Sequence, residues 1–156
     1  MTHDELVKKG VTWLRKQNCG VILHDPFAAA LTSGERPDVM GFRSGGMASI
    51  VIECKTSRAD FLADRKKPFR INPERGLGRW RFMMAPVGLV SVDELPERWG
   101  LLEVDGRRVI DTHGVPGNML WASEPQFEID EENEVRILYS ALSKQLKSDN
   151  ANGVTR

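Results

Sequence analysis

A chain of 156 residues with 40% hydrophobic and 28% charged residues has the composition of a soluble globular domain and is long enough for one packed core. None of its apolar stretches approaches the roughly 18 residues of a membrane span, and its acidic first residues do not resemble a secretion signal. The two cysteines, Cys19 and Cys54, lack C-x-x-C spacing, which argues against a zinc site or a disulfide scaffold. We therefore expect a cytoplasmic protein with no membrane partner.

The net charge of zero hides two charged blocks. Residues 55–81 carry nine basic against three acidic residues, a net charge of +6, whereas residues 124–134 carry six acidic residues and no base. A dense positive segment suits a polyphosphate partner, although solvated Lys/Arg-rich loops are also common. The acidic block could instead dock a basic partner or mimic nucleic acid.

The first half of the chain predicts a helix and three strands. Apolar residues recur at helical spacing over residues 2–17, and Asn18-Cys19-Gly20 ends that helix. Strands are expected at residues 21–24, 37–42 and 49–55, with a loop of small residues at 26–35.

The second half begins with a helix. Ser57 is placed to cap it, with Asp60 reaching back, and Pro68 is expected to end it. Next come a turn-rich loop at 72–78, a strand at 80–85, a hairpin of residues 100–104 and 107–110, and a C-terminal helix at 133–147. We predict one domain over residues 1–147 and a flexible polar tail at 148–156.

The strand at 49–55 ends in an acid and a base on one face. Side chains alternate along a strand, so Glu53 and Lys55 point one way while Cys54 points the other. Asp38, directly after Pro37, belongs to the preceding strand. Two converging carboxylates can hold Mg²⁺, and a nearby lysine can orient a water or steady a phosphate. A turn residue at 38 and a solvent-facing Glu53–Lys55 pair are the plainer alternatives, but the apolar run before Glu53 is unusual for an edge strand.

The pattern Pro37-Asp38 with Glu53-x-Lys55 resembles the PD-(D/E)XK nuclease superfamily, and the run at residues 56–66 looks like its MmcB-type DNA-repair branch and related phage-borne proteins. The resemblance covers residues 4–86. It implies an α/β, restriction-endonuclease-like core in αβββαβ order, with a mixed central sheet of four to five strands flanked by helices. It further implies that Asp38, Glu53 and the backbone carbonyl of Cys54 bind Mg²⁺ or Mn²⁺, and that Lys55 assists the attacking water. Related enzymes often dimerise, so a homodimer is among the expectations.

Other residues have weaker patterns. Many members of that superfamily place a glutamate of the first helix in the site, which points to Glu5, yet Glu5 also fits a capping box with Thr2. The basic residues nearest the motif are the expected DNA phosphate contacts: Arg58, Lys66, Lys67, Arg79 and Arg81.

The sequence thus predicts a metal-dependent deoxyribonuclease acting in DNA repair, recombination or phage DNA metabolism. A non-catalytic nucleic-acid-binding or repair-accessory protein with the same fold is the main alternative. An interaction module built on the acidic block is a third.

Overall fold

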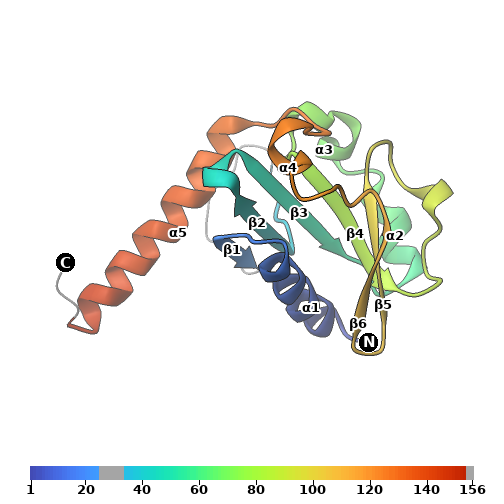
Figure 1. Cartoon of the computed structure of the whole chain (residues 1–156), viewed down its shortest axis with the longest axis horizontal. Coiled ribbons are helices and arrows are strands. Elements are labelled where there is room, and N and C mark those ends of the chain that lie inside the picture. Colours follow the sequence, from blue (N-terminus) through green and yellow to red (C-terminus); the bar gives the residue numbers. More distant parts are fainter. Residues whose placement is uncertain (25–33, 154–156) are drawn as a thin grey trace.

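A computed structural model describes residues 1–24 and 34–153, so most of the loop expected at 26–35 lies outside the described residues. The fold is mixed α/β, with one central sheet and helices on both of its faces (Figure 1). Among the described residues, none of the helices is both long and apolar enough to cross a membrane.

The sheet has six strands in the order β1-β2-β3-β4-β5-β6. The first three strands and the last two pair antiparallel, whereas β3, β4 and β5 run parallel. The strands are β1 (Val21–His24), β2 (Val39–Arg43), β3 (Ala48–Cys54), β4 (Trp80–Pro86), β5 (Gly100–Asp105) and β6 (Arg108–His113). The expected count of four to five strands is wrong, because the hairpin predicted near residues 100–110 joins the same sheet by pairing β5 with β4.

Two apolar layers cover the two faces of the sheet. On one face, Leu6 and Leu14 of α1 (His3–Lys16) pack with Ile50, Ile52 and other side chains of the strands. On the opposite face, Phe61 of α2 (Arg58–Asp64) packs with side chains of β4 and β5. The central strand β3 is buried along its whole length, so the side chains at its end are held by packing on both sides.

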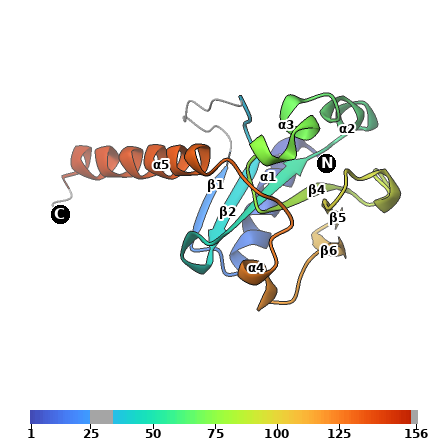
Figure 2. The ribbon, with the colours of Figure 1, turned by 90° about the horizontal axis from the view of Figure 1, so that it is seen from above.

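Short helices and turns lie in the connections between the main elements, and one long helix extends away from the sheet. α3 (Pro68–Ile71), α4 (Leu120–Ser123) and three 3₁₀ turns at Ser44–Gly46, Pro73–Arg75 and Val92–Glu94 lie between the strands and helices. α5 (Glu131–Ala151) starts against the sheet and then projects away from the body, as both views show (Figure 2).

The predicted helices need two corrections. The second helix ends at Asp64, and Pro68 begins α3 instead of only stopping α2, because proline is favourable in a first helical turn. α5 starts earlier than expected, capped by Asp130, and continues to Ala151. The tail predicted from residue 148 is therefore helical for four more residues, while residues 154–156 lie outside the described part of the chain.

Candidate functional site

The pairing of β2 with β3 brings the two predicted metal ligands together. Val39 lies opposite Ile52 in this antiparallel ladder, and one step further along the same register places Asp38 opposite Glu53. Directly opposed side chains of an antiparallel pair share a face of the sheet. The two acids therefore lie side by side at the end of β3, as the sequence pattern predicted.

Asp38 is fixed by two hydrogen bonds. Its Oδ2 accepts from the backbone N–H of Cys54 at 2.7 Å, and its Oδ1 lies 3.0 Å from Nε2 of His3, at the start of α1. The first bond joins the end of β3 to the residue before β2, and the second joins the helix to the same carboxylate. The carboxylate of Asp38 is thus held by β3 and by α1.

Pro37 has no N–H to donate to the carbonyl group of Cys54. The β2–β3 register, continued two steps beyond Val39–Ile52, puts Pro37 opposite Cys54. In a hydrogen-bonded pair each residue donates its N–H to the other, but proline has no N–H to donate. The Cys54 N–H has turned to Asp38, and the carbonyl of an extended residue points to the same side as its N–H.

Glu53 is a buried acid with a strongly altered proton affinity. The residue is 3% exposed, and its Oε1 lies 3.1 Å from Nη2 of Arg70. Burial raises the pKa of Glu53 to about 8, Arg70 opposes that rise, and the charge of Asp38 adds to it. A carboxyl group of this kind carries a proton over much of the neutral range, and a nearby cation would expel it.

Lys55 is placed differently from the expectation. It is 3% exposed, its Nζ lies 3.1 Å from Oδ1 of Asp64, and Asp60 lies 4.0 Å away. The prediction that Lys55 attends an attacking water is not met in this arrangement, because α2 returns two acids over the end of β3 and pairs the ammonium group with them.

Arg70 of α3 links these groups, and the sequence reasoning did not single it out. Its guanidinium contacts three acids: Asp64 at 2.7 Å, Glu53 at 3.1 Å and Glu35 at 3.4 Å. It also lies over the ring of Trp99, with 4.4 Å to the centroid. The sequence offered one indication of such a residue: a buried Glu53 needs a cation nearby to balance its charge. We call Glu35, Asp38, Glu53, Lys55, Asp64 and Arg70 the strand-end cluster.

Asp64 has a lowered pKa, whereas burial raises the pKa of Glu35 and Glu53. Burial by itself raises the pKa of Asp64, but Arg70 and Lys55, together with a hydrogen bond from Lys67, outweigh burial and bring the pKa down to about 2. Neighbouring acids of the cluster thus differ widely in proton affinity: Asp64 stays charged while Glu53 is near its midpoint just above neutral pH.

The carboxylates of Asp38 and Glu53 fit a hard cation that takes few ligands from the protein. Among the residues that the structure describes, no three His, Cys, Asp or Glu side chains are grouped to hold a metal. Mg²⁺, however, is commonly bound by one or two carboxylates, with waters and substrate phosphates filling its other positions. Two carboxylates and the Cys54 carbonyl meet that requirement.

Of the two predicted phosphate contacts on or next to β4, one is buried and the other is partly buried. Arg81 is 1% exposed and donates to the carbonyls of Gly78 at 2.8 Å and Pro73 at 2.7 Å. The prediction is wrong for Arg81. Side chains alternate along β4, and that of Arg81 points inward, beneath the loop that contains Pro73 and Gly78. Arg79 is partly buried and lies 3.5 Å from Glu131 at the start of α5.

The other three lie on α2 or directly after it. Arg58 forms a forked pair with Glu94, with nitrogen–oxygen distances of 2.6 and 2.8 Å. Lys67 lies 2.9 Å from Asp64. Lys66 is exposed and stays a predicted phosphate contact.

Glu5 completes the capping box that was its alternative explanation. Its backbone N–H donates to the Thr2 hydroxyl, and its Oε2 accepts from the Thr2 N–H at 2.6 Å. In the described structure its carboxylate is exposed at the start of α1, while Asp38 is reached by His3 instead. The capping alternative for Glu5 is thus confirmed, and its role in the site stays a prediction.

The expected homodimer remains a prediction. On α5, Val135, Tyr139 and Leu142 are exposed by 63%, 74% and 58%, and these apolar side chains are open to contact with another chain.

Comparisons with known proteins support the fold and leave the activity open. The chain matches no protein-family model and no curated protein. It is similar to a solved structure described as SPO1766, a protein of unknown function from Silicibacter pomeroyi, with a TM-score of 0.63 and 24% sequence identity over 97% of this chain and 92% of that one. This similarity concerns the fold alone.

Proposed function

We propose that this protein is a metal-dependent nuclease that hydrolyses DNA phosphodiester bonds, with Asp38, Glu53 and the Cys54 carbonyl as the ligands of Mg²⁺ or Mn²⁺. The observation that supports it most is the β2–β3 register, which sets two acids side by side at a strand end. Pro37 contributes because it has no N–H with which to occupy the Cys54 carbonyl. A restriction-endonuclease-like core is part of the same proposal.

The chain's own residues prepare the site in distinct ways. His3 and the Cys54 N–H hold both oxygens of Asp38, so that the carboxylate is oriented before any ligand arrives. Glu53, with its raised pKa, loses its proton when a cation binds beside it. A bound Mg²⁺ or Mn²⁺ would neutralise the phosphate oxygens and activate a water. Lys55, whose Nζ lies 3.1 Å from Oδ1 of Asp64, would assist that water if metal and substrate binding released it from this pair.

The alternative is a non-catalytic DNA-binding or repair-accessory protein, and one observation favours it. The two groups that the chemistry would use, Glu53 and Lys55, are both paired within the protein, with Arg70 and Asp64 respectively. An enzyme must break these pairs when substrate and metal bind, whereas a binding protein can keep them. DNA cleavage distinguishes the two functions.

The decisive experiment is a cleavage assay. Plasmid, single-stranded, flap and four-way-junction DNA are incubated with the protein in Mg²⁺, in Mn²⁺ and in EDTA. We expect metal-dependent cleavage of at least one substrate, and a loss of about 100-fold or more in Asp38→Asn, because that variant keeps the acceptor for the Cys54 N–H but loses a charged ligand. Lys55→Ala should lose activity to a similar extent.

Asp93→Asn is the matched control. It makes the same chemical change at an exposed position of the Val92–Glu94 turn and should cleave like the wild type. Circular dichroism melting checks that each variant folds. DNA binding without cleavage in all three conditions would overturn the nuclease proposal and favour the accessory function.

A further inference from the structure

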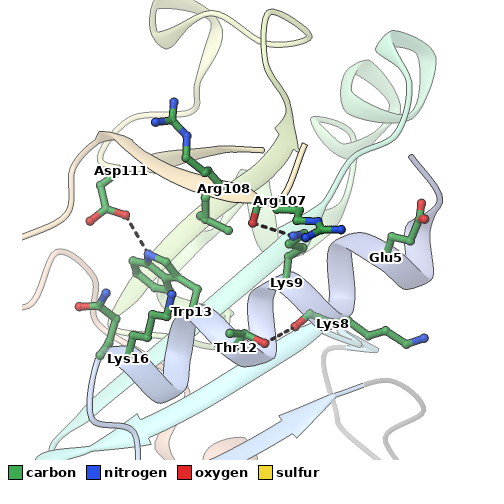
Figure 3. Close-up of a pocket in the computed structure, with 11 residues that line it drawn as sticks. Glu5, Lys8, Lys9, Thr12, Trp13, Lys16, Arg107, Arg108 and Asp111 are labelled. Atoms are coloured by element: carbon green, nitrogen blue, oxygen red, sulfur yellow. Dashed lines mark hydrogen bonds between the residues drawn. The ribbon is translucent and has the colours of Figure 1, made fainter. Parts of the chain in front are cut away.

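A second feature of the molecule lies between α1 and the β5–β6 hairpin. There a pocket of about 740 Å³ runs along the helix, bordered by α1 on one side and by β6 with the turn before it on the other (Figure 3). Trp13 and Val109 provide apolar lining, and the remaining lining residues are almost all charged or polar. We call this pocket the α1–β6 groove.

Two hydrogen bonds hold the walls of the groove together. Trp13 donates from Nε1 to Oδ1 of Asp111 at 2.8 Å, and Lys9 donates from Nζ to the backbone carbonyl of Arg107 at 2.7 Å. Each bond joins the helix to the hairpin across the groove. The width of the groove is thus set before any ligand binds, which lowers the entropic cost of binding.

The groove is strongly basic. Two acids line it, Glu5 and Asp111, and one of them is engaged by Trp13. Five bases face them: Lys8, Lys9, Lys16, Arg107 and Arg108. Within the described chain, Lys8, Lys16 and Arg107 form no ion pair, and all three are exposed. A focused positive potential of this kind attracts polyanions.

We propose that the α1–β6 groove binds the phosphodiester backbone of single-stranded DNA. The choice of DNA as partner rests on the proposed function, and position supports it: His3, at the start of α1, contacts Asp38, so the groove begins beside the strand-end cluster. From Glu5 to Lys16 the helix extends about 16 Å at about 1.5 Å per residue, which is room for a few nucleotides.

The lining favours a single strand over a duplex. A duplex presents phosphates and base edges, whereas an unpaired strand also presents the apolar faces of its bases. The groove offers both kinds of surface, since Val109 and the aliphatic stems of the lysines lie between the charges. The surface predicted from sequence lacks this combination, because Arg58 and Lys67 are paired with acids.

The test is the salt dependence of binding, measured by fluorescence anisotropy with a labelled 12-nucleotide single strand in EDTA. The logarithm of the binding constant falls with the logarithm of salt concentration by about 0.7 for each neutralised phosphate of a single strand. We expect Lys8→Gln/Lys16→Gln to reduce that slope by about 1.4. The matched control is Lys144→Gln/Lys147→Gln, which removes the same charge from two exposed positions of α5 and should leave the slope unchanged.

Three outcomes would overturn the inference: no binding of the strand by the wild type, an unchanged slope in the groove variant, or an equal decrease in both variants. Inorganic pyrophosphate provides a further arm. If it binds as tightly as the oligonucleotide, the groove takes small anions instead of a strand. Because EDTA excludes cleavage, failure here is distinct from failure of the nuclease proposal, and groove-dependent binding without cleavage would support the accessory function.

Discussion

The strand-end cluster and the α1–β6 groove use charge in opposite ways. In the cluster, acids and bases are buried and paired with one another, as in Lys55 with Asp64 and Arg70 with Glu53. In the groove, cations from residues 8 and 107, far apart in the sequence, face solvent with few acids nearby. A basic block in a sequence is thus a poor guide to a basic surface, because its charges are used first by the nearest buried acids.

The first way to sharpen this comparison is to remove one arginine from each region. Arg70→Met should cost about 3–5 kcal/mol of unfolding free energy, because it leaves Glu35, Glu53 and Asp64 buried without their shared cation. Arg108→Met is the matched control in the groove, where an exposed pair with Asp105 at 3.8 Å is worth about 0.2–1 kcal/mol. Urea denaturation measures both. Equal losses would contradict the distinction between the two regions.

The second prediction concerns the pH dependence of stability and tests Glu53 of the strand-end cluster. Glu53 has a raised pKa in the folded protein, so its contribution to stability is fully present below its unfolded pKa near 4.5 and is lost as pH rises through about 8. Glu53→Gln mimics the protonated acid and should remove this part of the alkaline loss, which is on the order of a few kcal/mol. Thermal unfolding at pH 5, 7 and 9 measures it.

The controls for the pH prediction follow from the other shifted acids. Glu35 and Glu134 also have raised pKa values because of burial, so the Glu53→Gln variant should still lose some stability with rising pH, but less than the wild type. Asp64 works in the opposite direction: its stabilising effect is present above pH 3.8 and lost toward about 2. A Glu53→Gln variant as pH-sensitive as the wild type between pH 5 and 9 would contradict the burial of a protonated Glu53.

Local regularities made part of the site predictable. The alternation of side chains along residues 49–55 placed Glu53 away from Cys54, and the structure confirms it, because Cys54 packs in the α1 layer while Glu53 contacts Arg70. Capping chemistry gave the start of α1 at Thr2. These features depend on residues within a few positions of one another, so a sequence pattern contains them.

The rest depends on contacts between distant residues. Neither the pairing of β5 with β4 nor the return of Arg70 over the end of β3 has a local pattern. The α1–β6 groove depends on a hydrogen bond from Lys9 to the backbone carbonyl of Arg107, and these residues are 98 positions apart. Such contacts are set by how the layers pack, which periodicity within one element does not report.

The smallest expected effect is that of the groove lysines on stability. Lys16 lies in the last turn of α1, where a positive charge interacts favourably with the helix dipole, so its loss should cost about 0.3–0.5 kcal/mol. Lys8 is exposed and makes no ion pair with a described residue, so Lys8→Gln should change stability by less than about 0.5 kcal/mol. Urea denaturation of Lys8→Gln/Lys16→Gln should therefore fall close to the wild type, even where its DNA binding is much less dependent on salt. A loss comparable to that of Arg70→Met would mean that the groove cations support the fold, and the contrast between paired structural charges and open binding charges would not hold.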